Sequence, residues 1–190
     1  MSSFEFVFSL LAILLGLALA EVLGGLARVI KHRPAVRIGW GMALLTAWSL
    51  TEIVLFWRVA WRARNYLPDT SPALLAGFAI TALYYFAGAL LWPEELERRD
   101  SLDDWFMQEK AKVIGALLAA NTLAYGLRPL IMGRASWAYM EWFDIASLTG
   151  LTLAAIVAII SKRRGVAIAC LAFLVLIDGL DPIEAVMWPN

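Results

Sequence analysis

The sequence predicts an all-α polytopic integral membrane protein, a single domain in which six helices form one transmembrane bundle. Three observations support this prediction: the composition, six apolar segments of membrane-spanning length, and the basic and aromatic residues at the segment ends. Hydrophobic residues make up 62% of the 190 positions, and the mean hydropathy is +0.73. Soluble domains contain about 45–50% apolar residues, and a chain this short leaves much of its surface exposed when it folds in water. A lipid bilayer is therefore the predicted solvent.

The six apolar segments mostly come close to the ~20 residues that cross ~30 Å of hydrocarbon as an α-helix. Turn-forming and charged residues separate them. The sixth segment contains Asp178, Gly179, Asp181 and Pro182, so its helix is expected to span and then break near its outer end. The predicted spans cover approximately residues 4–30, 38–61, 72–92, 113–132, 143–160 and 166–188.

The basic residues predict the orientation, because cytoplasmic loops of membrane proteins carry an excess of lysine and arginine. With the N-terminus outside, the cytoplasmic side receives eleven basic residues and the outer side five. Tryptophans lie near the predicted span ends on both sides, as in the aromatic belts of membrane proteins, and only Trp48 falls well inside a span. We therefore expect a multi-pass protein of a bacterial inner (plasma) membrane with both termini outside.

The stretch 93–112 connects the third and fourth spans and is predicted to form an elbow at the cytoplasmic interface. Ser101 followed by Asp104 is typical of a helix start, with a hydroxyl cap and an acidic residue in the first turn. Its mixed charges indicate a solvated segment rather than a binding site. Three residues of this elbow are expected to lie on the membrane surface: Leu102, Trp105 and Phe106.

Two short segments of the chain resemble each other. Residues 89–93 read Ala-Leu-Leu-Trp-Pro, and residues 185–189 read Ala-Val-Met-Trp-Pro. Each closes the third span of a three-helix half, and two such halves in series would be inverted relative to each other, as in many transporters. The alternative is that tryptophan is simply common at the ends of membrane helices, and both interpretations stay open.

The first span contains one acidic residue among small ones. Glu21, Gly24, Gly25 and Arg28 are spaced so that they share one helical face. A carboxylate inside a bilayer costs roughly 2.5–3.5 kcal/mol on insertion scales, so Glu21 is expected to face the bundle and to have a partner. Functionally it is a candidate proton or cation site; structurally it is a buried pair with Arg28 or a polar anchor between helices.

A ladder of small residues runs beside that face. Gly16, Ala20 and Gly24 follow a small-xxx-small spacing, which lets a second helix approach closely. These three residues are predicted to pack a helix, either within the bundle, from a second copy of the chain or from a membrane partner.

Glu52 is the second acidic residue predicted inside a span, and Asn121 lies midway through the fourth span. If Glu21 and Glu52 approach one another, the repulsion between them favours the binding of a proton by one of them. We therefore group Glu21, Arg28, Glu52 and Asn121 as candidates for ion or proton coupling. The bland alternative is that such polar residues only hydrogen-bond between helices.

A layer of opposite charges is predicted at the outer ends of the spans. Exposed ion pairs contribute only about 0–1 kcal/mol each, and two nearby aspartates fall short of the six to eight oxygens that calcium prefers. An ion-pair layer is therefore favoured over a metal site. Its members are Arg58, Arg128, Asp144, Asp178 and Asp181.

Several functional classes are excluded by what the sequence lacks. There is one cysteine and one histidine, so neither an internal disulfide nor a histidine-based zinc site can form. No motif for nucleotide, serine-hydrolase or zinc-hydrolase chemistry is present, and no cofactor or metal is predicted. The net charge is zero, so nucleic acid is not an expected partner.

Three functions remain open. The first is a non-enzymatic membrane protein that packs with itself or with a membrane partner in the lipid bilayer. The second is a small transporter or channel for protons, ions or a small solute that uses intramembrane carboxylates. The third and weakest is an intramembrane enzyme that acts on lipid, which rests only on the acidic stretch 100–104.

Overall fold

The computed structural model describes residues 3–31, 36–62, 70–95, 101–132 and 142–187. Within these residues the chain is all-helical and contains no strand; a single backbone bridge joins Arg37 to Ser101. The all-α prediction is therefore confirmed, and the number of helices matches the number of predicted segments. The helices are α1 (Ser3–Lys31), α2 (Trp40–Arg62), α3 (Ser71–Leu91), α4 (Asp103–Met132), α5 (Trp142–Ile160) and α6 (Arg164–Met187).

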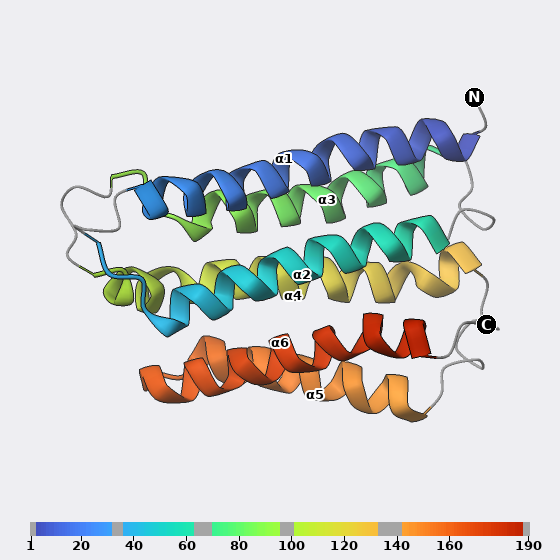
Figure 1. The fold of residues 1–190 in the computed structure, drawn as a ribbon. Helices are drawn as coiled ribbons and strands as arrows, with labels where there is room; N and C mark the ends of the chain where they lie inside the picture. Colours follow the sequence, from blue (N-terminus) through green and yellow to red (C-terminus); the bar gives the residue numbers. More distant parts are fainter. Residues whose placement is uncertain (1–2, 32–35, 63–69, 96–100, 133–141, 188–190) are drawn as a thin grey trace.

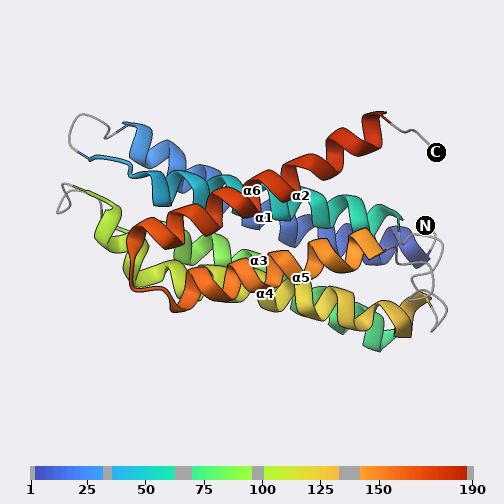
Figure 2. The same cartoon turned by 90° about the horizontal axis from the view of Figure 1, so that it is seen from below.

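The helices lie side by side in three pairs, α1 with α3, α2 with α4, and α6 with α5 (Figures 1 and 2). The closest packing is that of α3 on both α1 and α4, followed by that of α6 on both α2 and α5, whereas α2 contacts α4 only lightly. Helices α2 and α4 lie between the other two pairs (Figure 1). We call the end at which α1, α3 and α5 finish the inner end, and the opposite end, at which α6 finishes, the outer end (Figure 1).

Buried residues on the helices repeat alternately every three and four positions. This spacing places one apolar seam on each helix against its neighbours, as in a coiled coil. The apolar seam of α1 packs against that of α3. The seam of α6 extends from its start at the inner end as far as Asp178. The buried positions on these three helices include Leu11, Leu15, Ala18, Val22 and Val29 of α1, Ala73, Ile80, Tyr84, Ala87 and Leu91 of α3, and Ala167, Leu171, Leu174 and Asp178 of α6.

The outer surface of the bundle is apolar. Large hydrophobic side chains such as Ile13, Leu75 and Ile160 are 62%, 68% and 70% exposed, where a helix bundle in water would carry polar residues. Among the residues that the structure describes, three helices are long and apolar enough to cross a membrane, at Val7–Lys31, Trp40–Trp61 and Ser71–Leu91, and a shorter apolar helix covers Ala146–Ile160. The chain therefore has the features of a membrane protein.

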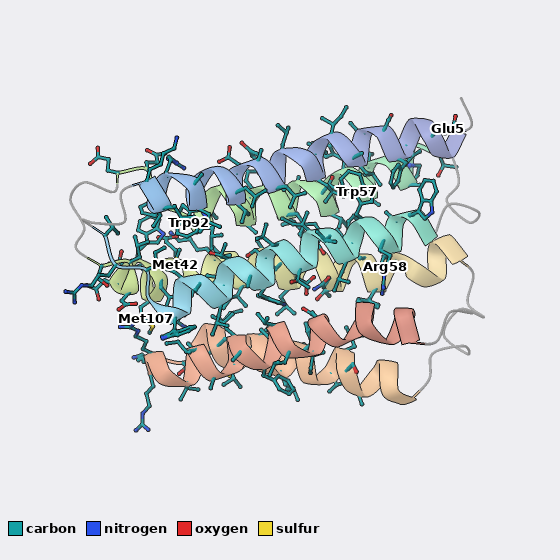
Figure 3. All side chains as sticks on the ribbon, viewed as in Figure 1. Glu5, Met42, Trp57, Arg58, Trp92 and Met107 are labelled. Atoms are coloured by element: carbon teal, nitrogen blue, oxygen red, sulfur yellow. The ribbon has the colours of Figure 1, made fainter. Side chains whose placement is uncertain are left out.

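The seam between α1 and α3 depends on glycines. A Cβ atom added at Gly25 would lie 2.0 Å from Cδ1 of Trp92, so no larger residue fits there without displacing that ring. Trp92 lies at the inner end of α3 beside α1 (Figure 3), where its indole N–H donates to the backbone oxygen of Val22 at 3.0 Å. A Cβ at Gly88 would lie 3.0 Å from the oxygen of Ala18. The two helices are therefore in close backbone contact.

The elbow before α4 differs in part from the prediction. The backbone N–H of Asp103 donates to the Ser101 hydroxyl at 3.2 Å, which agrees with a helix start at this point. Leu102 and Phe106 are fully buried in the core, however, so the expectation that they lie on the membrane surface is wrong. The backbone N–H of Leu102 donates to the backbone oxygen of Arg37 at 3.2 Å. This bond holds the elbow against the segment that precedes α2.

The last helix does not break at its polar residues. α6 continues from Arg164 to Met187 through Asp178 and Pro182, so the expectation of a break near its outer end is wrong. The Asp178 side chain has a partner in the core, the indole N–H of Trp48. The two three-helix halves also pack differently: α2 lies in the middle pair, whereas α5, its counterpart in an inverted repeat, lies in an outer pair. The helix packing therefore gives no support to the repeat interpretation.

Candidate functional site

Two carboxylic acids meet in the middle of the bundle. Glu52 comes from α2 and Asp178 from α6, and their side chains are only 4% and 6% exposed. The two carboxyl groups are within hydrogen-bonding reach of one another. They are brought together because α2 packs on α6 and each acid continues the buried seam of its helix. We call Glu52 and Asp178 the acid pair.

Neutral donors from three helices surround the acid pair. The Asn121 amide on α4 donates to Oε2 of Glu52 at 2.9 Å, and the indole N–H of Trp48 on α2 donates to Oδ2 of Asp178 at 2.7 Å. The Tyr84 hydroxyl on α3 donates to Oδ1 of Asn121 at 3.2 Å and also lies within hydrogen-bonding reach of Glu52. The bond from Tyr84 orients the Asn121 amide so that its NH₂ group faces Glu52.

Two other buried polar side chains near the site on α2 do not take part in this network. The hydroxyl of Thr46 donates to the oxygen of Met42 at 2.7 Å, and the hydroxyl of Ser49 donates to the oxygen of Leu45 at 2.8 Å. Such bonds to the preceding helical turn satisfy a hydroxyl inside a membrane or a core. Thr46 and Ser49 therefore supply no donor to the acid pair.

The chemistry that suits this arrangement is the binding of a proton. Two carboxylates in contact repel strongly in a medium of low dielectric constant, and one proton placed between them replaces the repulsion with a hydrogen bond. A metal cation fits less well, because N–H donors already point at oxygens of both acids. Within the residues that the structure describes, no group of three or more metal-ligating side chains occurs.

The structure brings together two of the four residues expected to act in ion or proton coupling, Glu52 and Asn121. Glu21 is half-buried on α1, where its Cβ lies against Gly88 of α3. The groups that interact with Glu52 are Asp178, Asn121 and Tyr84, so the approach of Glu21 to Glu52 does not occur. Arg28 lies on the exposed face of α1 near the inner end.

The predicted outer charge layer is described only in part. Asp178 belongs to the acid pair rather than to a surface layer, and Arg58 lies half-buried on α2 towards the outer end (Figure 3). The side chains of Arg128, Asp144 and Asp181 lie outside the described residues.

The small-residue ladder lies on the outside of the bundle. Gly16, Ala20 and Gly24 are exposed on α1, and nothing lies within 4 Å of a Cβ atom added at Gly16 or at Gly24. The close contact between α1 and α3 uses Gly25 instead. Within the part of the chain that the structure describes, the ladder therefore packs against no other helix.

Sequence reasoning did not identify Asp178, Trp48 and Tyr84 as members of one site. Two signals were present. Trp48 is the tryptophan that falls well inside a predicted span, and a buried indole N–H needs an acceptor. Asp178 also follows Ala167, Leu171 and Leu174 at the three- and four-residue spacing of a buried seam.

The inner end holds a second group of charged residues. The Lys110 ammonium on α4 is buried and donates to the backbone oxygens of Ala158 and, at 3.0 Å, Ile159, in the last turn of α5 where carbonyls lack helical partners. Burial lowers the pKa of the Lys110 ammonium, while Cys170 opposes this shift.

Arg164 at the start of α6 forms an ion pair with Asp103 at the start of α4. Asp103 was part of the acidic stretch considered for lipid chemistry, and in the structure its carboxylate is engaged by this arginine. Asp100 lies outside the described residues, and Asp104 is exposed in the first turn of α4.

No protein-family model matches this chain, and neither a curated protein nor a solved structure is similar to it at a significant level.

Proposed function

We propose that the protein spans a bacterial-type plasma membrane six times and carries protons, alone or coupled to a small solute, through its acid pair. The observation that supports this most directly is the contact between the side chains of Glu52 and Asp178 in the middle of the bundle. Each acid accepts a hydrogen bond from a neutral N–H group. A carboxyl pair of this kind can take up and release a proton with small movements of its helices.

Membrane insertion of all six helices is supported by the outer surface. Exposed apolar side chains occur on both the first and the last helices, for example Ile13 on α1 and Leu176 on α6, and the helices run side by side over comparable lengths (Figure 1). The lipid bilayer satisfies such a surface, while the backbone groups are satisfied within each helix.

The orientation proposed places the inner end in the cytoplasm and both termini outside. α1 begins and α6 finishes at the outer end (Figure 1). The inner end carries Lys31, Arg37, Lys112 and the run Lys162, Arg163 and Arg164, as the excess of basic residues on the cytoplasmic side requires.

Proton flux in liposomes tests the proposal. The unmodified protein, Glu52→Gln and Asp178→Asn are reconstituted around a pH-sensitive dye, and a pH gradient is imposed with potassium and valinomycin to balance charge. We expect flux from the unmodified protein and the rate of protein-free liposomes from both variants. Glu109→Gln is the matched control, because Glu109 is an acid at the inner end that pairs with Lys112 three residues away, and its flux should be unchanged.

Two results would contradict the proposal. If the unmodified protein conducts no protons under any proton, ion or solute gradient, the transport function fails. If Glu52→Gln retains full flux while folded, the acid pair is not the carrier.

A second function, packing with itself or with a membrane partner, is favoured by one specific observation. Gly16 and Gly24 lie exposed on α1, and among the described residues nothing lies within 4 Å of a Cβ atom added at either. Small residues of this spacing commonly admit a second helix. Crosslinking in native membranes tests this function with single cysteines introduced at Leu17 and Leu23 in a Cys170→Ser background. A strictly monomeric result would contradict it.

A further inference from the structure

Tyr84 occupies a special place beside the acid pair. It is fully buried at a point where α3 touches α2 only lightly, and its ring packs on Phe56 of α2 with ring centroids 5.2 Å apart. Its hydroxyl reaches two acceptors on two different helices, Oδ1 of Asn121 on α4 and the carboxyl group of Glu52 on α2. A phenol has one hydrogen to donate, so it donates fully to only one of the two acceptors at a time.

We infer that Tyr84 senses the proton on Glu52 and transmits this state to α3 and α4 by exchanging its hydrogen-bond acceptor. The inference rests on the proposed function, because it requires that the acid pair binds and releases a proton. It assigns to Tyr84 the role of a positioning residue that links proton binding to the packing of the helices.

The exchange follows from the strength of the two hydrogen bonds. When Glu52 is ionised, its carboxylate is the stronger acceptor, because hydrogen bonds to charged groups are roughly twice as strong as neutral ones. Tyr84 then donates to Glu52. When a proton binds to Glu52, the new O–H group donates to the Asp178 carboxylate, and the Tyr84 hydroxyl turns back to Oδ1 of Asn121. The added proton stays on Glu52, and the covalent O–H bond of Tyr84 is never broken.

The consequence reaches beyond the site because Asn121 loses or regains its donor with each exchange. The bond between Tyr84 and Asn121 joins α3 to α4, and the bond between Asn121 and Glu52 joins α4 to α2. Since α3 is also packed closely on α1, a change at Tyr84 alters how the pair α1 and α3 is held against the middle pair. Alternating access in transporters uses movements of one helix group against another.

Other titratable groups act on the same two residues. Among the described residues, Asp178 of α6 and Tyr84 of α3 interact with Glu52, and Tyr125 of α4 and Asp178 interact with Tyr84. Any pH dependence of the exchange therefore includes Asp178 and Tyr125.

Infrared difference spectroscopy of the purified protein in lipid, recorded as a function of pH, tests the inference. The carboxylic acid C=O band reports proton binding at the acid pair, and the tyrosine C–O band reports the acceptor of the phenol. In the unmodified protein we expect both bands to change with the same midpoint. Both changes should disappear in Glu52→Gln. The tyrosine change alone should disappear in Tyr84→Phe, and both should persist in Tyr85→Phe, which removes a neighbouring half-buried hydroxyl.

If the carboxylic acid band titrates while the tyrosine band of the unmodified protein does not change, the inference is wrong and the proposed function stands. If no carboxylic acid band titrates at all, the proposed function itself fails. The comparison of the unmodified protein with Glu52→Gln does not depend on the folding of Tyr84→Phe.

Discussion

The middle of the bundle and its inner end hold buried or partly buried charge in opposite ways. At the inner end Arg164 meets Asp103, and Lys110 meets the negative carbonyl end of α5. In the middle, two acids meet each other, and Trp48 and Asn121 supply only neutral donors. Opposite charges are stable as a fixed structure, whereas like charges become stable by gaining a proton. The comparison teaches that the inner end holds its helices with opposite charges, whereas the proposed function assigns the change of state to the middle.

The largest expected effect comes from removing the acceptor in the middle. Asp178→Leu leaves the buried N–H of Trp48 without its partner and should lower the free energy of unfolding by about 2–4 kcal/mol. Asp178→Asn keeps an oxygen for the same bond and should cost less than about 1 kcal/mol. Thermal unfolding in detergent, followed by tryptophan fluorescence, measures both. Equal losses in the two variants would mean that the Trp48 bond does not stabilise the middle.

The next effect concerns the cation at the inner end. Lys110→Met leaves the carbonyls of Ala158 and Ile159 without this donor and should lower stability by about 1.5–3 kcal/mol. Lys112→Met is the matched control, because the Lys112 ammonium lies on the surface and pairs with Glu109; its cost should stay below about 0.5 kcal/mol. If Lys112→Met lost more stability than Lys110→Met, the bonds from Lys110 to the last turn of α5 would not be what stabilises the inner end.

Lys110 also predicts a dependence on pH. Its pKa is lowered in the folded protein, so the unfolded chain binds this proton more tightly. Stability should therefore rise with pH between the folded value and the ordinary lysine value of about 10.4. The difference in unfolding temperature between the unmodified protein and Lys110→Met should increase as the pH is raised from 7 towards 10. If this difference in unfolding temperature decreased over the same pH range, the predicted rise of stability with pH would be wrong.

A comparable effect is expected from a single methyl group at the inner end. Gly25→Ala forces Trp92 to move, because the added Cβ would lie 2.0 Å from the ring, and such overpacking typically costs about 1–3 kcal/mol. Gly24→Ala is the neighbouring control, with nothing within 4 Å of the added atom. It should be neutral or stabilising by up to about 1 kcal/mol, since alanine favours helix over glycine. Similar unfolding temperatures for the two variants would rule out tight packing at Trp92.

The smallest effect is expected from the ion pair at the inner end. Asp103→Asn should cost less than about 1 kcal/mol, because Arg164 and Asp103 are 44% and 24% exposed. The cost should decrease further at high salt. Unfolding temperatures at low and high ionic strength measure it. A loss comparable to that of Asp178→Leu would remove the distinction between the two regions.

The fold class could be predicted from the sequence because the segments are apolar and the basic residues mark their ends. The pairing of the helices could not, because most segments are apolar on more than one face, so no single stripe shows which neighbour each helix takes. Glu52 and Asn121 were recognised as candidates for this reason only: they are polar residues within spans. Their partners, Asp178 and Tyr84, depend on the packing of α2 on α6 and of α3 on α4.

Glu21 and Asp178 both show that the sequence alone does not reveal which helix an acidic residue faces. Glu21 shares an obvious helical face with small residues, but the helix facing it is α3 rather than α2. Asp178 stands among a glycine, a proline and another aspartate, so it resembles the end of a span. Only its position on the buried seam of α6, opposite Trp48, reveals that it points inward.

The bond between Trp48 and Asp178 also has a consequence for biosynthesis. The two residues are 130 positions apart, so Trp48 and Glu52 leave the ribosome long before the last helix exists. Until α6 has been synthesised, Glu52 on α2 lacks its contact with Asp178. A chain truncated before α6 therefore presents an exposed polar group to the bilayer, a feature that membrane proteases and chaperones can recognise. The bond between Trp48 and Asp178 can therefore form only after α6 has been synthesised.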